Sequence, residues 1–297
     1  MIKTKTFSIL GGDPRQAHLA NALAAREDGF HIYAMMLYEG IKLNKKIVRV
    51  DDVKMILPQS DVVILPLPLL SNGGEEINAP GSQRKVMLEE CLHYIHPETI
   101  VLAGKVPAFA REQAALRGVE IIDYLEREEF TVLNAVPTAE GAVEIALREL
   151  PITLFGATCL ITGYGRIAKV LAGLLRSFGA KVIVVARKWS DLAWVNVAGC
   201  QPVHLSEMAE HLPAADLVVN TVPSMLFEED KLALLKRSCL VIDLASKPGG
   251  VDMEAAKALG LKAEWALSLP GKVAPVTAGV ITLDTIFNIL HERGAIP

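Results

Sequence analysis

The sequence has no excess of basic charge. It carries 30 lysines and arginines against 34 aspartates and glutamates, mixed along the chain, for a formal net charge of −4. Nucleic-acid binding depends largely on a concentrated basic surface that neutralises phosphates. The composition therefore argues against nucleic acid as a partner.

Long apolar runs are also missing. The run Phe7–Leu10 is broken at once by two glycines, an aspartate and a proline, whereas a secretory signal needs a longer apolar core. The most apolar stretch, Val62–Leu70, contains Pro66 and Pro68 and is far shorter than the roughly 20 residues that cross a bilayer. We therefore expect a cytoplasmic protein with no membrane partner.

Cysteine is sparse and unpaired. Cys91, Cys159, Cys200 and Cys239 stand far apart, without a C-x-x-C pair and without a nearby histidine cluster. Zinc sites and disulfide frameworks both show characteristic cysteine spacings, so neither is indicated and we predict no metal site. The apolar neighbours of these thiols predict reduced core residues.

The 297 residues, 51% of them hydrophobic, suffice for two domains with buried cores. In the first third, short apolar runs alternate with helical patterns, which predicts a parallel sheet covered by helices. The predicted strands are 6–10, 31–36, 62–65, 100–103 and 119–122, with a helix at about 14–26. A second series of predicted strands, 158–162, 181–186, 217–220, 240–243 and 261–264, indicates a second doubly wound unit.

Two helices are expected to connect these units. Thr138 can cap a helix that runs to Leu150, ends at Pro151 and bridges the domains. The stretch 277–293 is predicted to form a helix that crosses back to the first domain. The predicted fold class is thus α/β, with two doubly wound parallel-sheet domains. We expect a flavodoxin-like substrate or partner domain at 1–133, completed by 277–297, and a Rossmann dinucleotide-binding domain at 134–276.

A glycine turn follows the strand 158–162. Gly163 allows a tight turn, Gly165 lets a pyrophosphate approach the backbone, and free amides at the helix start bind the anion. The motif reads Gly163-Tyr164-Gly165-Arg166-Ile167-Ala168 and leads into a helix with an apolar face. Strand, turn and helix in this order predict a nicotinamide-coenzyme site and hydride transfer.

The next strand ends in Arg187-Lys188, where an NAD site usually carries an acidic residue for the ribose hydroxyls. Arg187 can pair with a 2′-phosphate, so we predict NADP, with NAD as the alternative. Both side chains could also be a solvated strand end. Loops after two later strands are expected to face the nicotinamide, although they could be plain turns. Their predicted coenzyme contacts are Thr221, Val222, Pro223 and Ala245.

Several loops together resemble those of the dipicolinate synthase family of spore-forming bacteria, in its A subunit, and the similarity runs across nearly the whole chain. The strings are 11–16, 64–66, 134–141, 220–225, 243–250 and 269–279, of which the last two are the most specific. One departure is Leu67-Pro68-Leu69, where a more polar segment is expected. The resemblance implies oxidation of dihydrodipicolinate to dipicolinate with NADP in the mother-cell cytoplasm during sporulation. It also implies that the partner is the flavoprotein-like B subunit of dipicolinate synthase, and we expect a homo-oligomer.

Such a dicarboxylate substrate needs cationic clamps, a hydride acceptor and a base. We assign carboxylate binding to Arg15, Lys247 and Lys272, which lie in loops bearing glycine or proline, and orientation of substrate or nicotinamide to Ser224. Arg15 could instead pair with Asp13 at a helix start, and Lys247 could be a surface lysine. Glu140 is a further candidate for a polar contact, and Thr221 for orientation, although Ser224, Thr221 and Glu140 could equally cap helices or close loops. No base stands out, because all seven histidines lie outside the matched loops.

Two other functions fit parts of the pattern. A D-2-hydroxyacid dehydrogenase shares the two-domain plan, but such enzymes resemble one another in a late catalytic histidine, and 267–279 contains none. A non-catalytic subunit could instead hold NADP while its partner performs the chemistry.

Overall fold

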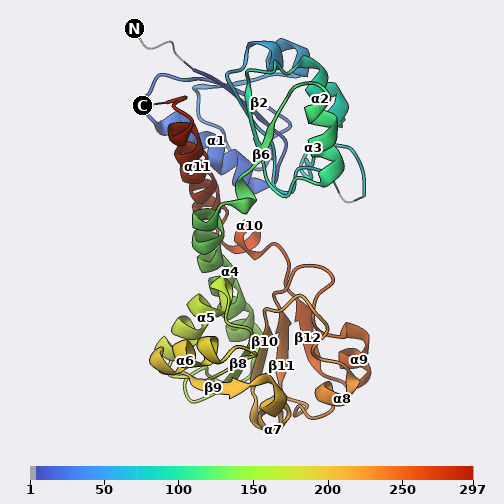
Figure 1. Cartoon of the computed structure of the whole chain (residues 1–297), viewed down its shortest axis with the longest axis vertical. Helices are drawn as coiled ribbons and strands as arrows, with labels where there is room; N and C mark the ends of the chain where they lie inside the picture. The colour runs from blue at the N-terminus through green and yellow to red at the C-terminus, as the bar shows by residue number, and fades with distance from the viewer. Residues whose placement is uncertain (1–4, 72, 297) are drawn as a thin grey trace. The chain divides into compact units, whose positions relative to one another are not determined.

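The computed structural model describes residues 5–71 and 73–296, drawn in Figure 1. They form two compact units. The first holds the described residues up to Leu133 and from Ala274 onward, and the second is the continuous segment Asn134–Val273.

A six-stranded parallel sheet forms the centre of the first unit, in the order β3-β2-β1-β4-β5-β6. Its strands are β1 (Thr6–Leu10), β2 (His31–Met35), β3 (Ile47–Arg49), β4 (Val62–Ile64), β5 (Ile100–Ala103) and β6 (Ile121–Asp123). Without β3 the order would be that of a flavodoxin-like sheet, and the extra edge strand gives the Rossmann order instead. The sequence did not predict β3 because only Ile47 of its three residues is buried.

Helices cover both faces of this sheet. They are α1 (Pro14–Ala25), α2 (Leu88–Tyr94), α3 (Ala108–Ala115) and α11 (Pro275–Glu292), with 3₁₀ turns η1 (Val53–Met55), η2 (Leu57–Gln59) and η3 (Tyr124–Glu126). Leu19 of α1 and Ile286 of α11 share one apolar cluster with Phe7 of the sheet, while α2 and α3 contribute to a separate cluster. Helices α1 and α11 lie side by side (Figure 1).

The helix that joins the units is longer than expected. Helix α4 spans Glu128–Glu149 with Pro137 inside it, so the prediction that it starts at a Thr138 cap is wrong. The Thr138 hydroxyl donates to the Asn134 carbonyl at 2.8 Å, one turn back, as a residue inside a helix does. A proline usually interrupts a helix interior and a threonine is a common N-cap, so the pair Pro137-Thr138 favours a helix start at Thr138. Here, however, buried Ala135 and Ala139 continue an apolar stripe across the proline.

The second unit contains another six-stranded parallel sheet, in the order β12-β11-β10-β7-β8-β9. Its strands are β7 (Thr158–Thr162), β8 (Lys181–Ala186), β9 (Gln201–His204), β10 (Leu217–Asn220), β11 (Leu240–Asp243) and β12 (Lys262–Trp265). The edge strand β9 was not predicted, because only Val203 in it is fully buried.

Shorter helices complete this Rossmann unit. They are α5 (Arg166–Ser177), α6 (Trp189–Val197), α7 (Met208–His211), α8 (Glu229–Leu232), α9 (Met253–Ala258) and α10 (Leu269–Val273), with 3₁₀ turns η4 (Leu205–Glu207) and η5 (Leu212–Ala214). The buried face of α5, including Leu171 and Leu175, packs with α4 and the sheet in one apolar cluster. The carboxyl ends of β7, β8, β10 and β11 therefore carry their loops on a rigid base.

Candidate coenzyme site and substrate residues

The glycine turn between β7 and α5 has the geometry that its sequence predicts. Gly163 has φ +87°, and a Cβ there would lie 2.7 Å from Thr221 Oγ1 and 2.9 Å from Val222 Cγ2. Only glycine combines that backbone angle with so close a neighbour. At Gly165 a Cβ would meet nothing within 4 Å. The backbone at Gly163 is therefore packed against the next loop, whereas the space beside Gly165 is free of protein atoms.

The start of α5 has room for an anion. Its N-cap is Gly165, and no side chain caps the first turn. A helix start in this state has backbone N–H groups and a positive dipole end available to a phosphate. The chain thus fits the pyrophosphate of a dinucleotide at this position.

A cavity of about 200 Å³ lies beside the turn. It is lined by Gly163, Tyr164, Arg187, Lys188, Asp191, Val222 and Ser224, among others. Arg187 and Lys188 are both exposed at the carboxyl end of β8. The predicted 2′-phosphate side chains therefore border the same cavity as the glycine turn.

The remaining residues of the motif take different positions. Tyr164 packs against the core cluster, and the Lys169 ammonium lies 5.5 Å from its ring centroid. Burial raises the pKa of the Tyr164 phenol. Ile167 also packs on the cluster, while Arg166 is exposed and engaged in an interaction at the start of α5.

A buried hydrogen-bond network joins the loops after β7, β10 and β11. The Thr162 hydroxyl donates to Asn220 Oδ1 at 2.6 Å, and Asn220 Nδ2 donates to Asp243 Oδ1 at 2.7 Å. Asp243 is fully buried and also accepts from the backbone N–H groups of Ala245 and Gly250. The network fixes the 245–250 loop relative to the β7 strand end.

Close packing reinforces this network. A Cβ at Gly250 would lie 2.4 Å from Asn220 Nδ2 and 2.6 Å from the Val222 carbonyl. Thr221 Oγ1 donates to the Thr162 carbonyl at 2.7 Å, and the Ala245 carbonyl accepts from Trp265 Nε1. Thr221 and Ala245 therefore hold the loops in place, whereas Pro223 is exposed.

The predicted substrate residues are not all at this cavity. Ser224 lines it and is exposed, and Lys247 is exposed in the loop that Asp243 holds. Lys272 lines a different hollow of the second unit, together with Glu144, Arg148 and Glu264. Glu140 is exposed on α4.

Arg15 belongs to the first unit and is firmly held. Its Nε and Nη2 bond to the Asp13 carboxylate, and Nη2 also donates to the Leu67 carbonyl at 2.9 Å. Asp13 is at the same time the N-cap of α1, accepting from the Arg15 N–H. Arg15 therefore pairs with Asp13, as the alternative interpretation of its sequence position expected.

Several residues of this cavity were not predicted from the sequence. Asp191, Leu205 and Leu226 line it. Next to them in the sequence, the Trp189 ring stacks on His204 at a centroid distance of 4.9 Å. Asp191 lies four residues after Arg187, so the helical turn after β8 was the available signal.

Across residues 5–71 and 73–296, no group of three or more histidine, cysteine, aspartate or glutamate side chains is placed to hold a metal ion. Within them too, no helix combines the length and apolarity that crossing a bilayer requires.

The comparisons with known proteins divide the chain in the same way. Residues 6–125 match the family model of the N-terminal domain of the dipicolinate synthase A subunit. Residues 138–259 match the NAD-binding domain of the D-isomer specific 2-hydroxyacid dehydrogenases.

Full-length relatives match the whole chain. The A subunit of dipicolinate synthase from Bacillus subtilis (strain 168) is 29% identical over 98% of both chains. The crystal structure of this subunit from Bacillus halodurans has a TM-score of 0.89 and 29% identity, over 98% of this chain and 99% of the other. The crystal structure of the Bacillus subtilis protein gives 0.88 and 30%, over 99% and 98%.

Fold and site together define an oxidoreductase-type α/β protein with a Rossmann domain for a nicotinamide dinucleotide. Its first domain and its full-length relatives narrow the class further. The chain belongs to the family of the dipicolinate synthase A subunit.

Proposed function

We propose that the chain oxidises dihydrodipicolinate to pyridine-2,6-dicarboxylate with NADP, together with a flavoprotein-like second subunit. The observation that carries this proposal is the similarity to the A subunit of dipicolinate synthase across 98% of the chain, both domains included. We place the reaction in the mother-cell cytoplasm during sporulation and propose that the chain acts as a homo-oligomer.

NADP is the proposed coenzyme because two cationic side chains border the cavity beside the glycine turn. Arg187 and Lys188 follow β8, where a 2′-phosphate would lie in a Rossmann site. Among the described residues that line this cavity, Asp191 is the one carboxylate, and it would favour a ribose hydroxyl instead. Two cations against one carboxylate support NADP over NAD.

The reaction removes two electrons and two protons from a ring that becomes aromatic. Bound NADP would supply the electron acceptor. This chain's residues would then bind and orient the substrate, with Arg15, Lys247 and Lys272 as the proposed partners for its carboxylates and Ser224 as an orienting hydroxyl. Aromatisation supplies driving force, so only modest acid–base help is needed.

The test is a spectrophotometric assay. Purified chain, NADP and freshly prepared dihydrodipicolinate are mixed with and without the partner protein, and NADPH absorbance is followed. We expect absorbance to rise with this chain alone. No rise in either mixture, or no calorimetric heat with either nicotinamide coenzyme, would overturn the proposal.

Two alternatives are separated by the same assay. Absorbance that rises only with the partner supports a subunit that holds NADP while its partner acts. NADPH formation from a 2-hydroxy acid, and none from dihydrodipicolinate, supports a D-2-hydroxyacid dehydrogenase. That alternative is favoured by the match of residues 138–259 alone.

A further inference from the structure

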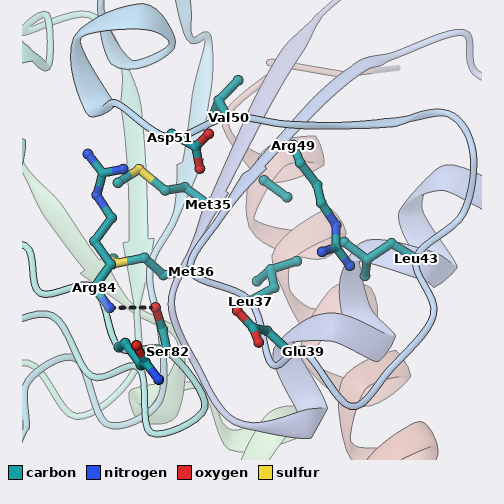
Figure 2. A pocket seen from close by; sticks show the side chains of 12 residues that line it. Met35, Met36, Leu37, Glu39, Leu43, Arg49, Val50, Asp51, Ser82 and Arg84 are labelled. Carbon is teal, nitrogen blue, oxygen red and sulfur yellow. Dashed lines mark hydrogen bonds between the residues drawn. The ribbon is translucent and has the colours of Figure 1, made fainter.

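The first unit contains a cavity of its own, with a volume of about 420 Å³. Three segments line it: Ala34–Leu37 at the end of β2, Arg49–Asp51 at the end of β3, and Ser82–Arg84 from a distant loop, with Glu39 and Leu43 between the first two in sequence. Figure 2 shows Arg84 and Arg49 on the two sides of the Met35–Leu37 segment in that view. The volume lies in the range of small-molecule sites.

The strand register places this cavity at the position that the coenzyme cavity takes in the second unit. Leu10 of β1 pairs with Met35 of β2, as Thr162 of β7 pairs with Val185 of β8. Gly11 N then donates to the Met35 carbonyl at 2.9 Å.

The corresponding bond in the second unit runs from Gly163 N to the Val185 carbonyl at 2.8 Å. The helices that follow, α1 and α5, both begin four residues after their strand ends and both have 12 residues. Met36 and Leu37 therefore correspond to Ala186 and Arg187, beside the proposed 2′-phosphate position.

The start of α1 corresponds to the proposed pyrophosphate position at the start of α5, but in the first unit this position is closed. Gly12 N donates to the Asn78 carbonyl at 2.7 Å, and Asp13 caps α1 with its carboxylate. An anionic cap at the helix start opposes a second anion there. What stays open is the part beyond β2 and β3, which in a Rossmann domain holds the adenosine half of the coenzyme.

The lining of this open part has the chemistry of a nucleotide site. The charged side chains Arg49, Arg84, Glu39 and Asp51 form no ion pair with any residue in the described part of the chain. Guanidinium groups bind phosphate through two parallel hydrogen bonds, and carboxylates can accept hydrogen bonds from ribose hydroxyls.

Apolar side chains complete the lining. Met36 and Leu43 are half-buried and offer an apolar surface for a flat ring beside the buried Met35 and Leu37, and methionine adapts readily to such a shape. The four charges sum to zero, so the site attracts no anion by net charge. Their separate positions around the cavity would select a ligand that carries both a phosphate and hydroxyl groups.

We propose that this cavity binds a nucleoside monophosphate, separately from the coenzyme site. The phosphate contacts Arg84 or Arg49, the ribose contacts Glu39 or Asp51, and the base lies against Met36, next to the buried Met35. This proposed site does not depend on whether the chain catalyses the proposed oxidation.

Methyl NMR of the full chain, labelled with ¹³C at the methionine methyls, tests the proposal. Adenosine 5′-monophosphate is the probe, and Met35→Leu and Met36→Leu assign the two signals. We expect both signals to shift saturably, with half-saturation below about 1 mM. The double variant Arg49→Ala/Arg84→Ala should raise that concentration about tenfold or more and leave NADP affinity and activity unchanged.

The matched control is Arg237→Ala, which removes an exposed arginine of the second unit and should change neither signal. Circular dichroism checks that each variant is folded, and Arg84→Ala alone serves if the double variant is not. Because AMP can also enter the coenzyme cavity, only the Met35 and Met36 signals count.

Three results would overturn the nucleotide assignment. The first is the absence of any Met35 or Met36 shift at about 10 mM AMP, and the second is an equal shift in the double variant. The third is a shift with pyridine-2,6-dicarboxylate and none with AMP, which would make the cavity a dicarboxylate site. If the wild-type chain did not bind NADP, that result would contradict the proposed function and would not affect the proposed nucleotide site.

Discussion

Arg187 and Lys188 bear most directly on which coenzyme the second unit takes. Both are exposed at the end of β8 and border the cavity of the glycine turn, whose other charged lining residue is Asp191. An arginine pairs with a phosphate through charge-assisted hydrogen bonds, each worth about 1.5–3 kcal/mol. The 2′-phosphate is the only group that distinguishes the two coenzymes.

We predict that Arg187→Ala lowers the affinity for NADP about 10- to 100-fold and leaves that for NAD nearly unchanged, because only NADP loses a charge-assisted bond. Calorimetric titration of each coenzyme measures the effect. Lys181→Ala, an exposed lysine at the other end of β8, is the control and should change neither affinity. An equal loss for both coenzymes would contradict the assigned role.

Lys247 is a proposed substrate-binding residue in a loop that a buried carboxylate holds. The buried Asp243 carboxylate bonds to the backbone of Ala245 and Gly250 on either side of it. Lys247→Ala should therefore reduce turnover of dihydrodipicolinate about tenfold or more while NADP affinity stays the same. Steady-state kinetics and coenzyme titration measure the two effects.

Lys257→Ala, which removes an exposed lysine on α9, is the matched control for this variant. Wild-type turnover in Lys247→Ala would remove Lys247 from the mechanism.

The sequence predicted part of the candidate site. The glycine turn could be identified because its residues are consecutive in the sequence and each glycine is needed for a steric reason. The role of Asp243 as a buried anchor could not, because its partner Asn220 lies 23 residues away and only folding brings the two side chains together. The same holds for Arg49 and Arg84, which line one cavity although no sequence motif connects them.

Among the secondary-structure elements, the α1–α11 pair depends on one small residue. A Cβ at Gly279 of α11 would lie 2.6 Å from the Arg15 carbonyl and 2.9 Å from Leu19 N, both in the α1 backbone. Backbone atoms cannot move aside as a flexible side chain can. The two helices therefore approach each other more closely than any larger residue would allow.

We predict that Gly279→Ala destabilises the protein by about 1–3 kcal/mol, because the overpacking penalty exceeds the gain in helix propensity. Urea denaturation measures the free energy of unfolding. Gly173→Ala in α5 is the control: nothing lies within 4 Å of its Cβ, and the propensity gain should stabilise by up to about 1 kcal/mol. Equal effects of the two substitutions would show that the helix contact is looser.

Elements with a strong apolar pattern were predictable, and edge elements were not. Strands β3 and β9 each bury a single residue completely, so neither gives an apolar run. The start of α4 was misplaced because Pro137-Thr138 has the local chemistry of a helix start, and packing on both sides of it outweighs that preference.

For the whole molecule, buried thiols make the free energy of unfolding depend on pH in the alkaline range. Burial raises the pKa of Cys91 in the first unit, and of Cys159 and Cys239 in the second, to about 12, against 9.0 for an ordinary thiol. Above pH 9 the unfolded chain releases these protons while the folded chain keeps them. The contribution of these thiols to the free energy of unfolding is therefore fully present below pH 9 and decreases from pH 9 toward pH 12.

We predict that the free energy of unfolding falls between pH 9 and 12, by up to about 1.4 kcal/mol per pH unit for each thiol. Urea denaturation at a series of pH values measures the slope. Cys159→Ala should make the slope shallower, and an unchanged slope in that variant would contradict the contribution of this thiol.

The order of the chain has a consequence for its synthesis. Helix α11, which buries Ile286 and Leu290 in the core of the first unit, is made after the whole of the second unit. A ribosome that has already produced β1 to β6 thus holds a first unit with one apolar face uncovered, while the segment 134–273 can fold ahead of it. We therefore expect the second unit to fold before the first during synthesis. Chaperones should bind the unfinished first unit for the longest time.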